Sequence, residues 1–184
     1  MIVIKLGGSL SRSDTLIKCL NKIDSHYTAQ KIVIVPGGGA FADQVRLAQQ
    51  HWQFDETTAH RMALLAMQQM ALLIAGLKSR FSIAHSVPEI SQQLLKHAIV
   101  IWSPSITELD NAKVPASWDF TSDSLAAWLA TTLSATELIL VKSAVINNRL
   151  SLQQLADQSI IDAGFCTLVK QTSYKIRIIN QLDF

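Results

Sequence analysis

Lys5 stands inside an apolar stretch, VIKLGGSL, that runs directly into two glycines and a serine. A strand that ends in a glycine turn brings backbone N–H groups close to an anion, and a lysine just before the turn adds a positive charge to the same anion. The stretch therefore favours a phosphate as its ligand, although the motif is short and does not decide this by itself.

Three consecutive glycines, Gly37, Gly38 and Gly39, follow a second apolar stretch, KIVIV. One glycine is usually enough for a turn from a strand into a helix. Three indicate that the backbone approaches a ligand closely, with the N–H groups of a helix start pointing at a negative group. A plain tight turn is the alternative. The pattern matches neither the phosphate-binding loop with its trailing Lys-Ser/Thr nor the dinucleotide fingerprint GxGxxG.

Two acids, Asp119 and Asp123, flank the expected start of a helix in the stretch SWDFTSDSLAAWLA. Acids at this place are ordinary partners of the helix dipole. Asp123 is the more informative of the two, because its helix should begin at the same sheet edge as Lys5 and Lys142. A carboxylate between two lysines would hold both ammonium groups in place and help to bind a metal ion.

The elements that position these residues follow from the hydrophobic pattern. Strands are expected at residues 2–6, 31–35, 81–85, 98–102, 138–142 and 175–179. Helices are expected at residues 11–26, 40–51, 57–77, 90–96, 122–133 and 152–156. The alternation of strands and helices predicts a three-layer α/β/α fold with a mostly parallel central sheet. In such sheets ligands bind beyond the carboxyl ends of the strands, which is where the lysines and glycines fall.

Composition narrows the class of protein. With 184 residues, 49% hydrophobic and 16% charged, we expect a single domain over residues 1–184. The net charge is +2, and lysine and arginine are scattered, so nucleic acid is not an expected partner. No uninterrupted apolar stretch reaches the roughly 18 residues of a membrane span, and no signal peptide is evident, so we expect a cytoplasmic protein without membrane contact. Cys19 and Cys166 are expected to be buried thiols.

Four motifs together point to a known family. KLGGS, IVIVPGGGAFADQVR, TSDSLA and LILVKSA occur in this order between Lys5 and Ala144, and they resemble the amino acid kinase family. Within it, AHRMALLAMQQMA and VPASWDFTSDSLAAWLA look like the branch of aminomethylfuran-methyl phosphate kinases and their homologues in methylotrophic bacteria. The resemblance implies ATP-dependent phosphoryl transfer with Mg²⁺ to a small-molecule acceptor. The acceptor expected for this branch is a phosphate monoester in methanofuran-type cofactor biosynthesis, and the product is a diphosphate.

The resemblance also implies roles for individual residues. The residues expected to be catalytic are Lys5, Asp123 and Lys142, with Asp123 also a metal ligand. Those expected to contact the phosphates of ATP are Gly7, Gly8, Ser9 and Ser143. Those expected to face the acceptor are Gly37, Gly38 and Gly39. The acceptor side would cover about residues 1–118, and a reduced nucleotide side about residues 119–184.

Three further residues are candidates for binding the acceptor. Arg46 and Arg61 would clamp the phosphate that the acceptor already carries, since arginine pairs bidentately with phosphate. Solvated helix arginines are an equally good interpretation. His60 would face the acceptor pocket, and a structural, hydrogen-bonded histidine is the alternative.

The segment after Lys142 departs from the family pattern. VKSAVINNRLSLQQL lacks the Asp-Gly turn that family members commonly have there, and only 42 residues follow Lys142. The alternative hypothesis is therefore a relative that binds a ligand or forms a complex without turnover.

Residues 62–77 form the most apolar helical stretch, with Gln68 and Gln69 as nearly its only polar side chains. A helix that covers one face of a sheet in a monomer should show a polar outer stripe. We therefore expect a homodimer or larger homo-oligomer with this helix in or near the interface. Complete burial within the same chain is the alternative.

Overall fold

Six parallel strands form one sheet in the computed structural model, which describes residues 1–27 and 29–184. The strands lie in the order β3-β4-β2-β1-β5-β6. Their bounds are β1 (Ile2–Leu6), β2 (Ile32–Pro36), β3 (Ser82–Ala84), β4 (Ile99–Trp102), β5 (Glu137–Lys142) and β6 (Lys175–Asn180). The α/β fold with a parallel sheet is confirmed, and every strand pair within it is parallel.

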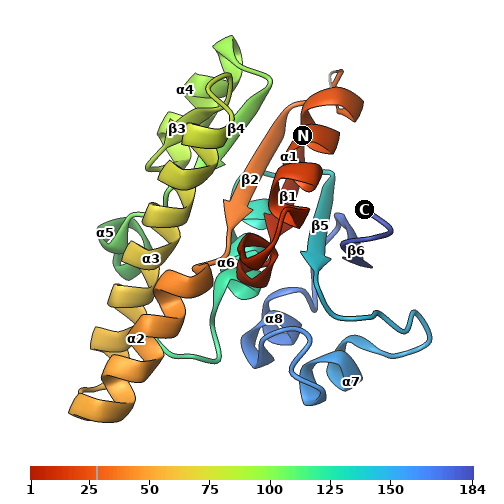
Figure 1. Ribbon diagram of the computed structural model, residues 1–184. Helices are drawn as coiled ribbons and strands as arrows, with labels where there is room; N and C mark the ends of the chain where they lie inside the picture. The colour runs from red at the N-terminus through yellow and green to blue at the C-terminus, as the bar shows by residue number, and fades with distance from the viewer. Residues whose placement is uncertain (28) are drawn as a thin grey trace.

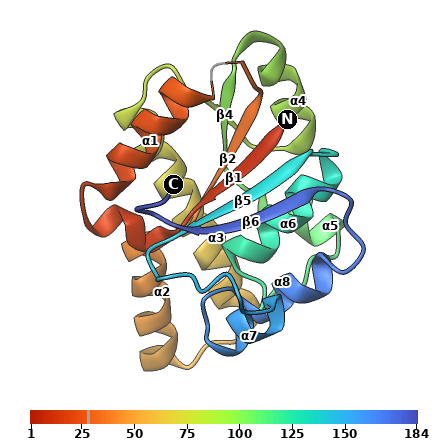
Figure 2. The same ribbon diagram turned by 90° about the vertical axis from the view of Figure 1, so that its right-hand side faces the viewer.

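Helices cover both faces of the sheet (Figures 1 and 2). Their bounds are η1 (Gly8–Arg12, a 3₁₀ helix), α1 (Thr15–His26), α2 (Gly39–Trp52), α3 (Glu56–Leu77), α4 (Val87–Lys96), α5 (Ile106–Asn111), α6 (Ser122–Thr132), α7 (Leu152–Asp157) and α8 (Ala163–Leu168). In Figure 2, α1 lies to the left of the strands, and α4, α5, α6 and α8 lie to the right. The result is the expected three-layer arrangement.

Two hydrophobic clusters, one on each face, form the core. Ile4 of β1 packs with Leu20 of α1 on one face, and Val3 of β1 packs with Leu125 of α6 on the other. The long helix α3 contributes to both clusters. Because side chains alternate along a strand, Lys5 follows Val3 onto the α6 face.

The same alternation acts in β5. Leu138 and Leu140 belong to the cluster on the α6 face, so Lys142 emerges on that face at the end of the strand. Strands β1 and β5 are direct neighbours. The sheet thus brings the two lysines to one edge and one face.

Several expected boundaries were wrong. The helix expected from residue 11 begins at Thr15, because the extended backbone of Ser13 separates it from the 3₁₀ helix η1. Two six-residue helices, α5 and α8, had not been anticipated. Each begins at a side-chain cap, Ser105 or Asp162, and each is too short to show a helical period.

Among the described residues, the helices include none that combines the length and the hydropathy needed to cross a bilayer.

Candidate active site

A buried carboxylate joins two lysines at the carboxyl edge of the sheet. The Lys5 Nζ atom lies 2.8 Å from Asp123 Oδ1, and Lys142 donates a hydrogen bond to Asp123 Oδ2. Lys5 and Asp123 are only 4% and 3% exposed. The structure therefore brings together three residues that lie far apart in the sequence, and the cluster carries a net positive charge.

The electrostatics of the cluster show how strongly its members interact. Burial alone would raise the pKa of Asp123, but the positive charges of Lys5 and Lys142 outweigh it and bring the pKa from 3.8 to about 2. Burial and the nearby charge of Lys5 lower the pKa of Lys142 and Asp123 opposes them, with the net result that the pKa falls from 10.5 to about 8. At neutral pH Asp123 is therefore an anion and Lys142 is mostly a cation.

Asp162, which the sequence analysis did not single out, fixes the helix that carries Asp123. Its carboxylate accepts hydrogen bonds from the backbone N–H groups of Thr121 (2.8 Å) and Ser124 (3.0 Å), and from both hydroxyls. It also accepts from the N–H of Phe165 at 2.9 Å, where it caps α8. One side chain therefore caps two helix starts. An aspartate just before a short apolar run was the only sequence signal for it.

The two glycine turns touch each other. A Cβ atom on Gly8 would lie 2.4 Å from the backbone nitrogen of Gly39, and one on Gly37 would lie 2.5 Å from the nitrogen of Gly8. No real Cβ tolerates such contacts, and Gly39 also has a φ of +56°. Glycine is thus required because two loops meet backbone to backbone at the end of β1 and β2.

A cavity of about 290 Å³ lies on the β5 side of the first glycine turn. Its lining includes both lysines of the cluster and the residues that the sequence analysis assigned to the donor phosphates, namely Gly7, Gly8, Ser9 and Ser143. The hydroxyls of Ser9 and Ser143 lie 2.8 Å apart. The segment after α7, including Ser159, lines the opposite wall.

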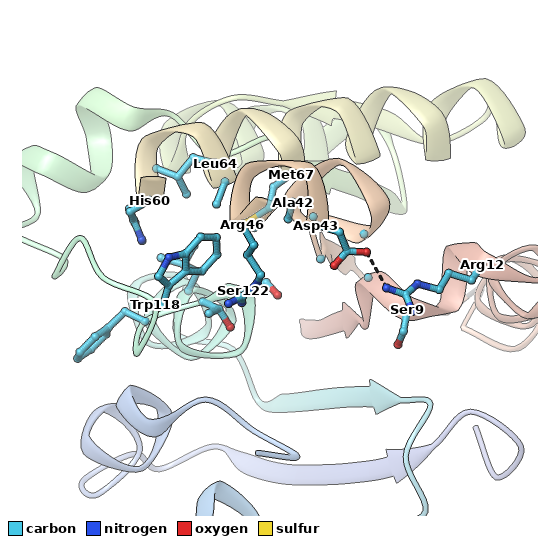
Figure 3. A pocket seen from close by; sticks show the side chains of 18 residues that line it. Ser9, Arg12, Ala42, Asp43, Arg46, His60, Leu64, Met67, Trp118 and Ser122 are labelled. Carbon is cyan, nitrogen blue, oxygen red and sulfur yellow. Dashed lines mark hydrogen bonds and ion pairs between the residues drawn. The ribbon is translucent and has the colours of Figure 1, made fainter. Parts of the chain in front are cut away.

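A second cavity, of about 230 Å³, lies on the α2 and α3 side of the same turn (Figure 3). Gly8 and Ser9 line both cavities, and the triple glycine lines only this second one. The remaining wall mixes polar and apolar side chains and comes from η1, α2, α3, α6 and the segment before α6. A group bound in one cavity can therefore reach a group bound in the other across the shared turn.

The three arginines near this second cavity differ in their partners. Arg12 pairs with Asp43 at 2.6 Å, and Arg61 pairs with Asp110 at 2.8 Å. Arg61 does not line the cavity, so the structure does not bring it to the site.

Arg46 has no carboxylate partner among the described residues. Its guanidinium lies over the ring of Trp118, 3.8 Å from the centroid, and the Trp118 indole donates to Gln49 at 2.7 Å. Arg46 lines the second cavity and also a third, of about 410 Å³, whose lining includes Lys5, Asp123 and Lys142; it does not line the first. It is the arginine available to an anion where the second and third cavities meet.

The described residues provide no group of free side chains that could bind a metal ion without phosphate. Each oxygen of Asp123 already meets a lysine ammonium group. Among the described residues, no three histidine, cysteine or acidic side chains gather as a metal cage. The geometry therefore does not favour Asp123 as a direct metal ligand, because its lone pairs point at two cations. Mg²⁺ would fit here only in company with phosphate oxygens.

Comparison with known proteins gives one family match. The sequence profile described as the amino acid kinase family matches residues 1–144. A curated relative, the [5-(aminomethyl)furan-3-yl]methyl phosphate kinase of Methanocaldococcus jannaschii, is 25% identical over 191 aligned positions. These cover 98% of this chain and 88% of the relative.

Solved structures share the fold. The uridylate kinase of Archaeoglobus fulgidus superposes with a TM-score of 0.77 at 18% identity, over 97% of this chain and 90% of its own. An isopentenyl phosphate kinase superposes with a TM-score of 0.63 at 15% identity, over 98% and 91%. The similarity extends well beyond Lys142, so the shortened segment after it is part of the shared fold.

Affinity for a polyphosphate should fall as the pH rises through about 8. The pKa of Lys142 is lowered to about 8, so the lysine is mostly charged at pH 7 and mostly neutral at pH 9. An anion binds only the charged form well, and the affinity should drop about tenfold per pH unit above the pKa. Calorimetry with inorganic tripolyphosphate from pH 7 to pH 9 measures this. Lys142→Arg keeps the charge and should flatten the profile, whereas an equally flat wild-type profile would contradict the assignment.

Asp162→Ala should destabilise the fold more than the loss of an ordinary cap. The carboxylate caps α6 and α8 together, and each cap lost to alanine costs about 0.5–2 kcal/mol. Ser86→Ala, which removes the cap of α4 alone, is the matched control. Thermal and urea unfolding of the two variants give the comparison. Equal losses of unfolding free energy would show that Asp162 serves only one helix.

Proposed function

As a member of the amino acid kinase family this chain is a small-molecule kinase, and we propose that it transfers the γ-phosphoryl group of ATP to a phosphate monoester, which yields a diphosphate. The acceptor belongs to the chemical class named in the curated relative, a ring-bearing methyl phosphate, as in methanofuran-type cofactor biosynthesis. The proposal includes a cytoplasmic location, where ATP is the available donor.

Arg46 carries the proposal for the acceptor class. It lines the second and the third cavity with no carboxylate partner among the described residues, close to the lysine–aspartate–lysine cluster and the triple glycine. A phosphate acceptor brings its own negative charge to an already anionic donor, so it needs a cation that the donor does not use. The name of the M. jannaschii relative supports an acceptor that already carries phosphate.

The residues have a simple division of labour in this proposal. The amide of Gly8 and the Ser9 and Ser143 hydroxyls hold the donor phosphates in the first cavity, whereas the Gly7 N–H donates to the carbonyl oxygen of Val141 and only shapes the turn. Lys5 and Lys142 neutralise the charge that develops on the transferred group, while Asp123 keeps both ammonium groups in place. The amides of Gly38 and Gly39 and the Arg46 guanidinium hold the acceptor phosphate in the second cavity, whereas the Gly37 N–H donates to the carbonyl oxygen of Leu6.

The chemical step needs no nucleophile from the protein. An oxygen of the acceptor phosphate attacks the γ-phosphorus while the bond to the β–γ bridging oxygen breaks. A P–O–P linkage forms, and ADP leaves with the electron pair of the broken bond. The chain contributes positioning and positive charge, which are the main requirements of phosphoryl transfer. Mg²⁺, when bound with the donor phosphates, supplies further charge neutralisation.

A non-catalytic relative is the weaker alternative. A protein without turnover would not need buried charges at this place. The lysine–aspartate–lysine cluster is nevertheless complete and buried. Burying such a cluster costs free energy that packing of apolar side chains would not cost. Its retention favours catalysis.

Lys5→Ala and Arg46→Ala should damage different kinetic constants. Lys5 acts on the transferred group, so its loss should lower kcat on the order of 10²-fold or more. Arg46 holds the acceptor, so its loss should mainly raise the acceptor KM. ADP release in the presence of Mg²⁺ and a panel of phosphate monoesters and amino acids measures both. Arg80→Ala, an exposed arginine in the turn after α3, is the control. Wild-type kcat in Lys5→Ala, or a panel in which only amino acids react, would refute the proposal.

The outer face of α3 supports a homo-oligomer as part of the proposal. Leu65, Leu72, Leu73 and Leu77 are between 40% and 64% exposed, so the chain does not bury this helix completely. The expected alternative of full burial was therefore wrong. Helix α2 runs beside α3 and extends this side of the molecule (Figure 1). An apolar stripe of this kind marks an interaction surface, and a second copy of the chain would cover it.

Leu72→Asp should convert the oligomer into a monomer. Leu72 is 64% exposed at the middle of the stripe, and a charge there opposes burial against a partner. Light scattering at micromolar concentration should give the wild type at least twice the chain mass of 20.3 kDa and the variant a single mass. Leu95→Asp, on an 84% exposed leucine of α4, should leave the assembly intact. A wild-type monomer would refute the interface.

A further inference from the structure

His60 lies at one end of the second cavity, away from the glycine turns. In Figure 3 its ring reaches from α3 toward Trp118, while Ser9 and Arg12 lie at the opposite end and Arg46 lies between them. The side chain is buried, with 7% of the residue exposed. An acceptor whose phosphate lies at the glycines would therefore direct its other end toward this histidine.

The hydrogen bond that His60 makes fixes its tautomer. The Nδ1 atom lies 3.2 Å from the backbone carbonyl oxygen of Ser117. A carbonyl oxygen can only accept, so Nδ1 must carry the proton and donate. Burial lowers the pKa of His60 below its ordinary 6.5, so the ring is neutral at pH 7.5. In a neutral ring with Nδ1 protonated, Nε2 holds a lone pair and no proton.

That lone pair is open to the cavity. Among the described residues none hydrogen-bonds Nε2 of His60, and the atom is not one of the fully enclosed polar atoms without a partner. The ring lines the cavity beside Ala63, Leu64 and Met67, which offer no hydrogen-bond donor. Water can pair with this acceptor while the cavity is empty, but a ligand that displaces the water leaves Nε2 unsatisfied unless the ligand itself supplies a donor.

We infer that His60 sets acceptor specificity, by selecting a phosphate monoester that carries a hydroxyl or amine donor at the end opposite its phosphate. The inference rests on the proposed function, because it takes the second cavity as the acceptor site. The apolar wall binds the body of the molecule, and Nε2 accepts one hydrogen bond from its far end. A molecule of equal size without the donor leaves Nε2 unpaired, and such a mismatch is a strong source of discrimination.

Binding of three probes tests the inference. The probes are benzyl phosphate, 3-(hydroxymethyl)benzyl phosphate and 3-(aminomethyl)benzyl phosphate, measured by calorimetry at pH 7.5 without ATP. Wild type should bind at least one donor-bearing probe about fivefold or more tightly than benzyl phosphate. His60→Phe keeps a flat ring without the acceptor, so the ratio should fall to near one. His60→Gln keeps an acceptor oxygen and should restore part of the preference.

The ratio within each variant, not the absolute affinity, is the decisive quantity, so a modest loss of stability in His60→Phe does not obscure it. His85→Phe, an exposed histidine after β3, is the matched control and should keep the wild-type ratio. A wild-type ratio near one, a ratio that survives in His60→Phe, or no binding of any probe would each overturn the inference.

Turnover separates this inference from the proposed function. The same probes are incubated with ATP and Mg²⁺, and ADP release is measured. Preferential binding of a donor-bearing probe without ADP release would leave the role of His60 standing and refute the kinase proposal for this acceptor class. ADP release with equal efficiency for all three probes would support the kinase and overturn the role of His60.

Discussion

The attraction of one buried carboxylate for two lysines is the interaction on which this site depends. Asp123 meets Lys5 with one oxygen and Lys142 with the other, inside the protein where water screens little. Apolar side chains of similar volume would be at least as stable at this place. The cluster is therefore better explained by what it holds, a fixed excess of positive charge, than by its contribution to folding.

Strand pairing, helix position and helix capping together place these three side chains. The alternation of side chains along two adjacent parallel strands sends both lysines to one face, and α6 begins at the same edge with its aspartate in the first turn. Asp162 then fastens the start of α6 to α8. The segment after the second lysine is short, yet it supplies this cap and one wall of the first cavity. It therefore contributes to positioning the cluster.

In the proposed function the two cavities hold different substrates. The first, for the donor, contains the lysines, whereas the second, for the acceptor, adds apolar side chains of α3 to its charged and polar groups. The glycine turns separate them by backbone alone, because no side chain fits where Gly8 meets Gly39. In the proposed function, Arg46 and His60, which both line the second cavity, set the specificity for the acceptor.

The sequence by itself determined the parallel α/β sheet, the glycine turns and the edge at which Lys5 and Lys142 would lie. These features depend on alternation and turn residues that act within a few positions of the chain. From the sequence, Arg46 and Arg61 were equally good candidates for binding the acceptor phosphate, and Asp162 was not recognised as a candidate. The tertiary structure decided these cases, because Arg61 meets an aspartate 49 positions away and Asp162 caps a helix about 40 positions earlier. Ion pairs and caps between distant segments arise only when the chain packs, so no local pattern announces them.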